Sequence, residues 1–206
     1  MVTVLNHSLI QDKLAKARSK QTQSSYFRSL LADISALMAY EIAKELPTSE
    51  VVIETPLAKC REEQFLSHGF AVVPVLRAGL GMMNGFLEVF PDATIGFIGL
   101  ARDEKTCKPR EYYRNLPDSL SDLDTIIVDP MLATGGSLSA AAELIAQLGP
   151  KSLKVVCLVA APEGIALFEK RFPEVQLFVA AIDEGLDEKG YIIPGLGDAG
   201  DRLFNT

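Results

Sequence analysis

The chain has 206 residues, 48% of them hydrophobic, and a formal net charge of -7. This length and apolar content allow a full core without disulfides or metals, so we expect one domain over residues 1–206. The negative charge argues against a general nucleic-acid binder, because the phosphate backbone attracts clustered Lys and Arg.

The sequence carries no signal for secretion or for a membrane span. Its N-terminus lacks a basic segment followed by an apolar stretch, and no apolar run approaches the roughly 20 residues that cross a bilayer. The three cysteines are widely spaced and odd in number, which suits reduced thiols better than a disulfide framework or a zinc ribbon. We therefore expect a soluble, cytoplasmic protein.

An amphipathic helix is predicted from Ser24 to Leu46, within an N-terminal helical segment of about residues 8–46. Apolar side chains recur there at helical spacing, at Phe27, Leu30, Leu31, Ile34, Met38 and Ile42. Pro47 ends this helix, since proline cannot continue it.

Short apolar runs then alternate with helical stretches. Runs of Val, Ile and Leu without polar alternation are typical of strands that helices cover on both faces. The predicted strands are Val51 to Ile53, Ala71 to Leu76, Thr94 to Leu100, Thr125 to Val128, Leu153 to Val159 and Val175 to Ile182. The predicted helices are Leu80 to Phe90, Gly136 to Leu148 and Pro162 to Phe172. The alternation indicates an α/β fold with a mostly parallel central sheet flanked by helices.

The last segment, about residues 183–206, is rich in Gly, Pro and acidic residues. We expect it to be too rich in glycine for the core and to carry function as loops on a rigid scaffold.

The strongest chemical signal lies at residues 125–137, where a buried strand ends in Asp129 and a glycine turn opens a helix. Ligands of open α/β sheets bind at such strand ends. Backbone N–H groups, two hydroxyls and the helix N-terminus at Thr134, Gly135, Gly136 and Ser137 could surround a phosphate monoester. Asp129 could accept hydrogen bonds from a sugar diol. The simpler alternative is an ordinary turn with a helix cap.

Three segments in order resemble a known family. Val128-Asp-Pro-Met-Leu-Ala-Thr-Gly-Gly-Ser137 resembles the 5-phosphoribosyl 1-diphosphate (PRPP) motif of type I phosphoribosyltransferases, in the form seen in uracil phosphoribosyltransferases. That family usually has two adjacent acids, whereas Pro130 follows Asp129 here, as in the uracil branch. Residues 73–83 resemble its pyrophosphate loop, and residues 191–202 its uracil-binding hood. The resemblance covers essentially the whole chain.

The resemblance implies a type I phosphoribosyltransferase-like fold with a C-terminal hood at about residues 183–206. It implies transfer of the phosphoribosyl group to N1 of uracil, giving UMP and diphosphate in pyrimidine salvage. The catalytic residues would be Asp129, Arg77, Arg102 and Asp198. Arg77 could present a guanidinium fork to the diphosphate, while Gly79 and Gly81 would let N–H groups approach it.

The implied ligand contacts fall into two sets. PRPP would be bound by Arg77, Arg102, Asp129, Pro130, Met131, Leu132, Ala133, Thr134, Gly135, Gly136, Ser137 and Asp198. Uracil would be bound by Tyr191, Ile192, Gly197, Asp198 and Ala199. The basic stretch from Lys105 to Arg114 would close over the site, and Mg²⁺ would arrive chelated by the substrate, held chiefly by phosphate and ribose oxygens.

Two alternatives stay open at this point. One is another type I phosphoribosyltransferase that acts on a purine or orotate, but the segment that resembles the hood favours uracil. The other is a non-catalytic, pyrimidine-sensing RNA-binding regulator on the same fold, but such a protein should have a basic face, whereas this chain is acidic. The resemblance further implies a homodimer or higher homo-oligomer, and GTP activates some relatives.

Overall fold

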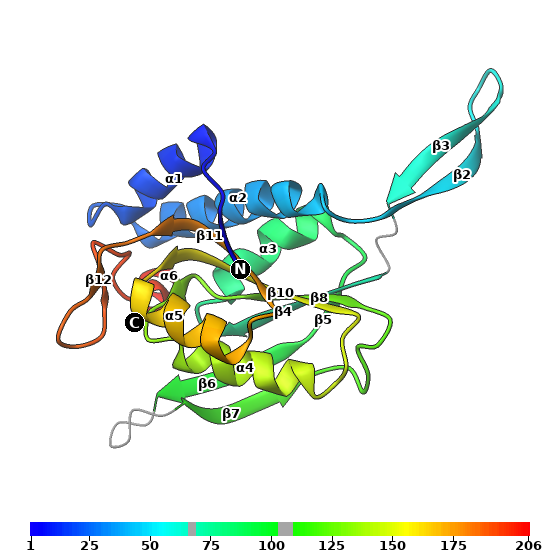
Figure 1. Ribbon diagram of the computed structural model, residues 1–206. Helices are drawn as coiled ribbons and strands as arrows, with labels where there is room; N and C mark the ends of the chain where they lie inside the picture. The colour runs from blue at the N-terminus through cyan, green and yellow to red at the C-terminus, as the bar shows by residue number, and fades with distance from the viewer. Residues whose placement is uncertain (66–68, 103–108) are drawn as a thin grey trace.

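The computed structural model describes residues 1–65, 69–102 and 109–206, with the side chains of Arg102 and Pro109 left out. Its main sheet has nine strands within these residues, flanked by helices on both faces (Figure 1). The order along the sheet is β1 (Val2–Val4), β11 (Gln176–Ile182), β10 (Ser152–Ala160), β8 (Asp124–Val128), β4 (Phe70–Leu76), β6 (Phe97–Arg102) and β7 (Pro109–Asn115). The short strands β5 (Thr94–Ile95) and β9 (Met131–Leu132) pair with β4 and β10. Neighbouring strands are parallel, except for the antiparallel pair β6–β7. The predicted α/β class and mostly parallel sheet are confirmed.

Two layers of helices explain why the central strands lack polar alternation. One face carries α1 (Ser8–Arg18), α2 (Ser24–Ala43) and α3 (Leu80–Val89), and the other carries α4 (Gly136–Ala146) and α5 (Pro162–Arg171) (Figure 1). In β8, Ile126 packs in the core cluster of the first face, while Ile127 packs in that of the second. Successive strand residues point to opposite faces, so both faces require apolar side chains.

The predicted helix from Ser24 is confirmed as α2. The apolar positions that suggested it, from Phe27 to Ile42, are all buried, and α2 packs against α3, α1 and α6 (Ala199–Phe204). The helix ends at Ala43, three residues before the sequence predicted.

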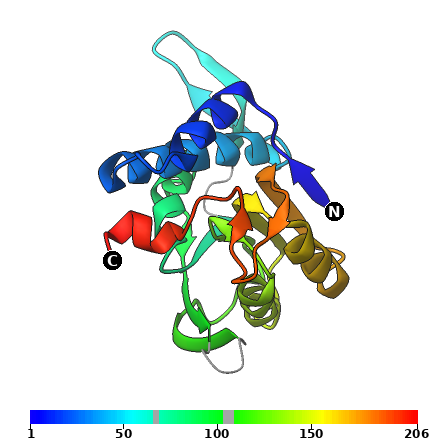
Figure 2. The ribbon, with the colours of Figure 1, turned by 90° about the vertical axis from the view of Figure 1, so that its left-hand side faces the viewer.

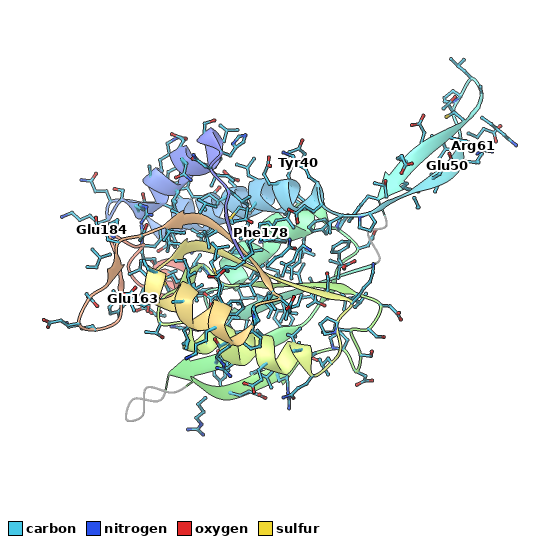
Figure 3. All side chains as sticks on the ribbon, viewed as in Figure 1. Tyr40, Glu50, Arg61, Glu163, Phe178 and Glu184 are labelled. Carbon is cyan, nitrogen blue, oxygen red and sulfur yellow. The ribbon has the colours of Figure 1, made fainter. Side chains whose placement is uncertain are left out.

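The predicted strand at Val51 to Ile53 does not belong to the main sheet. It lies in β2 (Thr48–Glu54), which forms a separate antiparallel hairpin with β3 (Lys59–Phe65) that projects from the molecule (Figure 1). Glu50 and Arg61 form an ion pair at 2.9 Å on this hairpin, and Figure 3 labels both. Val52 is 68% exposed, so the prediction that Val51 to Ile53 form a strand covered by helices is wrong.

The basic stretch from Lys105 to Arg114 was expected as a loop that closes over the site. Residues 105–108 lie outside the described part of the chain, whereas the rest belongs to β7, an edge strand of the main sheet. Residues 110–114 are all exposed and three of them are charged, which suits an edge strand because charged side chains hinder pairing with another strand, and this feature was missed. The short first strand, β1, was also not predicted from the sequence.

The expectation that the C-terminal segment is too glycine-rich for the core is wrong. This segment forms β12 (Gly185–Leu186), β13 (Ile192–Ile193) and α6 (Ala199–Phe204). Ile192, Leu196, Ala199 and Leu203 are buried in the same core cluster as α1, α2 and α3. Figure 2 shows α6 against the layer of α2 and α3. The glycines shape the turns, and the apolar residues between them anchor the segment.

No helix in the described part of the chain is both long and apolar enough to span a bilayer.

Truncation of Leu203 tests whether α6 belongs to the core. We expect Leu203→Ala to lower the free energy of unfolding by about 3 kcal/mol, because a fully buried leucine leaves a cavity. Urea denaturation measures this change. The matched control is Leu57→Ala, whose side chain is 97% exposed, with an expected change of less than about 0.5 kcal/mol. Equal effects in the two variants would mean that α6 adds no packing energy.

Candidate active site

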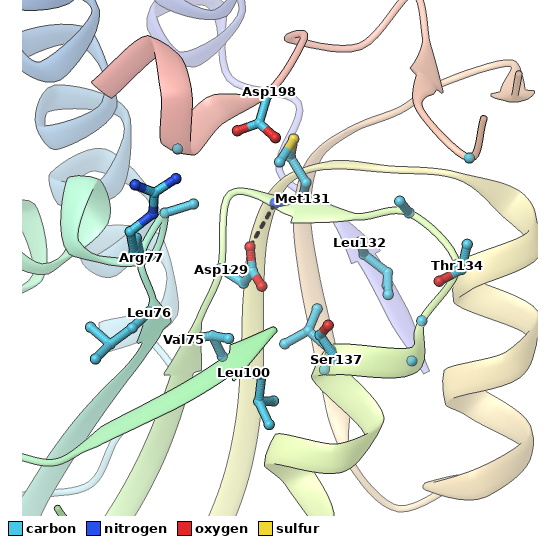
Figure 4. Close-up of a pocket in the computed structure, with 17 residues that line it drawn as sticks. Val75, Leu76, Arg77, Leu100, Asp129, Met131, Leu132, Thr134, Ser137 and Asp198 are labelled. Atoms are coloured by element: carbon cyan, nitrogen blue, oxygen red, sulfur yellow. Dashed lines mark hydrogen bonds between the residues drawn. The ribbon is translucent and has the colours of Figure 1, made fainter. Parts of the chain in front are cut away.

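A pocket of about 340 Å³ opens at the carboxyl ends of the central strands (Figure 4). β4 and β8 are parallel neighbours, so the residues that follow them meet at the same edge of the sheet. The predicted residues that line this pocket are Arg77, Asp129, Met131, Leu132, Ala133, Thr134, Gly135, Gly136, Ser137 and Asp198. Val75, Leu76, Ala78, Leu100, Leu138, Gly190 and Gly200 complete its wall. The topology thus brings together four parts of the chain, at residues 75–78, 100, 129–138 and 190–200.

Asp129 lies at the floor of the pocket and is 8% exposed. Its carboxylate Oδ1 accepts a hydrogen bond from the N–H of Met131 at 3.1 Å, and its own N–H donates to the carbonyl of Val156 at 3.1 Å. Burial raises the pKa of Asp129 from its ordinary value near 3.8 to about 7, against the smaller opposing effect of the Met131 bond. Hydrogen bonds from the hydroxyl groups of a ligand would therefore stabilise the charged form of Asp129, which burial disfavours.

The glycine loop, residues 131–137, forms the side of the pocket next to Asp129. It runs from β9 into α4, and Gly135 at the N-cap of that helix has φ of 82°, a left-handed conformation that favours glycine. Among the residues that the structure describes, no side chain caps α4 at this position. The first-turn N–H groups and the hydroxyls of Thr134 and Ser137 therefore remain available to an anion.

Arg77 lies across the pocket from Thr134 and Ser137, with Asp129 between them (Figure 4). It follows β4, and its peptide bond with Leu76 is cis. Its guanidinium lies 3.3 Å from the carboxylate of Asp201 and 6.0 Å from the ring centroid of Phe204, both in α6. About half of its side chain is exposed, so it keeps hydrogen-bonding capacity toward a ligand.

Arg102 is the last residue of β6, which pairs in parallel with β4, so its backbone lies at the same edge of the sheet as Arg77. Its side chain lies outside the described residues.

Gly79 and Gly81 were expected to let backbone N–H groups approach the diphosphate, but the structure gives them another role. Their N–H groups donate within the protein, to the carbonyls of Val75 at 2.8 Å and Ala78 at 3.1 Å. A Cβ on Gly79 would lie 2.6 Å from the carbonyl oxygen of Val128, so close packing of α3 on the sheet is what requires glycine there. A side chain at Gly81 would meet Leu203 instead.

Asp198 enters the pocket from the C-terminal segment, above the glycine loop (Figure 4). It is the N-cap of α6, and its Oδ1 accepts a hydrogen bond from the N–H of Asp201 at 2.9 Å. Sequence reasoning missed Gly190 and Gly200, which also line the pocket. The only signal for them was their place in the glycine-rich segment.

The other residues expected to bind uracil do not line the pocket: Tyr191, Ile192, Gly197 and Ala199. Ile192 and Ala199 are buried in the core, whereas the Tyr191 side chain is exposed. The N–H of Tyr191 donates to the Asp187 carboxylate and its carbonyl accepts from the Asp187 N–H, both at 2.8 Å. Pro130 is also absent from the lining, since it turns toward β10, where its carbonyl accepts from Leu158 and Val159.

A partly buried ion pair fastens the C-terminal segment to α1. Arg18 binds both carboxylate oxygens of Asp183, at 2.8 and 2.5 Å, and donates to the carbonyl of Gly195 at 2.8 Å. The N–H of Gly195 in turn donates to Asp183 at 2.9 Å. This arrangement joins the two ends of the loop that contains β12 and β13. Arg202 adds a second attachment, because it lies 4.0 Å from the ring centroid of Phe27 and donates to the carbonyl of Ser19.

Removal of the Arg18 guanidinium tests this attachment. We expect Arg18→Met to lower the free energy of unfolding by about 3 kcal/mol, because the buried carboxylate of Asp183 loses its cation. Chemical denaturation measures the loss. The control on the same helix is Lys16→Met, which removes an exposed pair with Asp12 and should leave stability almost unchanged, because water screens such pairs. A loss in Arg18→Met no larger than the control would exclude the ion pair as an anchor.

The raised pKa of Asp129 predicts that the site destabilises the fold at neutral pH. A pKa above the ordinary value means that stability is fully present below about pH 4 and declines as the pH rises to about 7. The asparagine in the variant Asp129→Asn cannot ionise, so we expect the variant to have a larger free energy of unfolding than the parent. This difference between variant and parent should be up to about 3 kcal/mol larger at pH 8 than at pH 5. Urea denaturation at both pH values measures this, with surface Asp122→Asn as the control. An equal difference at both values would contradict the assignment.

The whole sequence matches a family of known proteins. The sequence model described as "Uracil phosphoribosyltransferase" matches residues 4–206. The uracil phosphoribosyltransferase of Dictyoglomus turgidum is 50% identical over 206 residues, all of both chains. That of Clostridioides difficile is 52% identical over 205 residues, covering 100% of this chain and 98% of the relative.

Solved structures agree with the sequence comparisons. The AQ2163 protein from Aquifex aeolicus superposes with a TM-score of 0.95 at 41% identity, over 99% of this chain and 98% of that one. A hypoxanthine-guanine phosphoribosyltransferase from Bacillus anthracis has a TM-score of 0.51 at 18% identity, over 78% and 80% of the two chains, and shows the shared fold alone. Neither the purine or orotate alternative nor the non-catalytic regulator finds support among the curated relatives described above. The chain belongs to the uracil phosphoribosyltransferase family.

Proposed function

We propose that this chain transfers the phosphoribosyl group of PRPP to N1 of uracil and releases UMP and diphosphate. The observation that carries the proposal is the pocket in which Asp129, the glycine loop and Arg77 face one another at the strand ends. The pocket offers a carboxylate, a set of free N–H donors and a cation, which match a sugar, a phosphate and a diphosphate. Membership of the uracil phosphoribosyltransferase family supports uracil as the nucleobase that accepts the phosphoribosyl group.

The glycine loop binds the 5′-phosphate. Its uncapped helix N-terminus supplies N–H donors with a favourable dipole, and Thr134 and Ser137 add hydroxyl donors. Binding energy gained on this phosphate, which does not react, aligns the anomeric carbon with its two partners.

Arg77 and Arg102 stabilise the departing diphosphate. A guanidinium donates two parallel hydrogen bonds to phosphate oxygens, and charge grows on those oxygens as the bond to the anomeric carbon breaks. Mg²⁺ chelated by PRPP would supply further neutralisation of the charge on the leaving group. The described residues include no group of three or more His, Cys, Asp or Glu that could hold a metal, but Asp129 and Asp198 line the pocket. This donor set fits a magnesium ion whose other ligands are substrate oxygens and water.

Asp129 acts on the ribose. Its carboxylate accepts hydrogen bonds from the ribose hydroxyls, and these bonds favour its ionised form, which burial alone disfavours. The ionised carboxylate then stabilises the positive charge that develops on the sugar ring in an oxocarbenium-like transition state.

The hood supplies recognition of uracil. Asp198 lies in the pocket and could position or deprotonate the base. Backbone groups of Tyr191, Ile192, Gly197 and Ala199 would read its edge, where O4 of uracil accepts but the amino group of cytosine donates. An N–H aimed at O4 therefore rejects cytosine. Since the backbone of Tyr191 is already engaged with Asp187, we expect Gly197 and Ala199 to carry most of this recognition.

Some properties of the protein stay predictions that follow from the family. We expect residues 1–206 to act as one phosphoribosyltransferase domain in the cytoplasm, as a homodimer or higher homo-oligomer. Activation by GTP is a further prediction.

An assay with uracil, PRPP and Mg²⁺ tests the proposal, and Asp129→Asn locates the chemistry. The parent should form UMP and use neither hypoxanthine nor adenine. Asp129→Asn should lose at least about 100-fold in kcat/KM while staying folded, because it loses transition-state charge stabilisation. Surface Asp122→Asn is the control and should keep normal kcat/KM. Near-normal turnover by Asp129→Asn would remove this residue from the mechanism, and turnover of a purine would overturn the choice of base.

A further inference from the structure

Gly164 lies in the first turn of α5, behind the glycine loop and outside the pocket lining. It follows Glu163, which Figure 3 labels at the start of that helix. A Cβ on Gly164 would lie 2.2 Å from the carbonyl oxygen of Ala133 and 2.9 Å from that of Leu132. Real Cβ atoms essentially never approach other atoms within 3.0 Å, so only glycine fits here.

The contact between the glycine loop and α5 is made by backbone on both sides. A Cβ on Gly135 would lie 2.9 Å from the carbonyl oxygen of Gly164. Beside this contact, the N–H of Ala161 donates to the carbonyl of Leu132 at 2.9 Å. The glycine loop therefore rests directly on the backbone of the first turn of α5, with the side chain of Leu167 beside this contact.

A larger residue at position 164 would displace the glycine loop more readily than the helix. The clash is with backbone oxygens, which cannot rotate away as a side chain can. The helix α5 has ten residues and is fixed by Phe168, which is fully buried. The loop is joined to β10 by the two-residue strand β9 and to the residue after β10 by the bond from Ala161 N–H to the carbonyl of Leu132, and it has no longer element of its own. Any displacement thus reaches the pocket.

We propose that Gly164 is a positioning residue for the 5′-phosphate. Because it has no side chain, α5 can support the glycine loop at the position where the loop's N–H groups and hydroxyls meet the phosphate. This inference rests on the proposed function, and it concerns a residue that touches no substrate.

The variant Gly164→Ala separates this role from a general loss of structure. We expect its affinity for UMP, which carries the 5′-phosphate, to fall at least about tenfold, and the KM for PRPP to rise to a similar extent. Binding of magnesium diphosphate, on the Arg77 side of the pocket, should stay within about twofold of the parent. Isothermal titration calorimetry measures both affinities. Unchanged UMP affinity in folded Gly164→Ala would overturn the inference.

Gly85→Ala is the matched control. A Cβ on Gly85 would lie 2.1 Å from the carbonyl oxygen of Ala32, a clash of the same size between α3 and α2. This variant should lose stability but keep its UMP affinity within about twofold, since α2 and α3 do not support the glycine loop. An equal loss of UMP affinity in both variants would assign the effect to general loosening and overturn the inference.

Leu167→Ala decides the question if Gly164→Ala does not fold. Leu167 Cδ2 lies 3.3 Å from the place where a Cβ on Gly135 would be, and its side chain is 40% exposed, so truncation loosens the support without a clash. We expect UMP to bind at least about threefold more weakly. UMP affinity equal to that of the parent would overturn the inference. A parent chain that forms no UMP would instead remove the proposed function.

Discussion

The site depends on a carboxyl group placed where water cannot reach it well. Asp129 follows β8, whose last four residues are buried, so its own burial follows from the position of β8 in the middle of the sheet. Burial disfavours the carboxylate and raises its pKa. In the proposed mechanism the ribose hydroxyls of PRPP donate hydrogen bonds to Asp129 and favour its charged form, which offsets the effect of burial.

Glycines let the backbone segments around this carboxyl approach one another. Gly79 allows the segment after β4 to touch the end of β8, and Gly135 and Gly164 allow the glycine loop to touch α5. At each position a Cβ would meet a backbone oxygen. The glycines of this site therefore serve two purposes that sequence alone does not separate, because some face the ligand while others hold the elements that face it.

The core of the fold and the centre of the site could be predicted from local patterns. Continuous apolar runs identified β4, β8, β10 and β11, and the segment after Val128 located Asp129 and the glycine loop. Features that depend on distant partners were missed or misread. Val51 to Ile53 is as apolar as a buried strand, but it pairs only with the polar strand β3. The N–H groups of Gly79 and Gly81 find partners that only the turn after β4 creates.

The C-terminal segment shows why function and stability are coupled in this chain. Its position depends on an ion pair between Arg18 and the buried carboxylate of Asp183, while Leu196 and Leu203 lie in the main core. The same segment brings Asp198, Gly190 and Gly200 to the pocket. A hood built as a free loop would have to be ordered whenever a substrate binds, at a cost in conformational entropy. Because its anchors are core residues, folding has already met most of that cost, and the free energy of substrate binding remains available for alignment of the reacting groups.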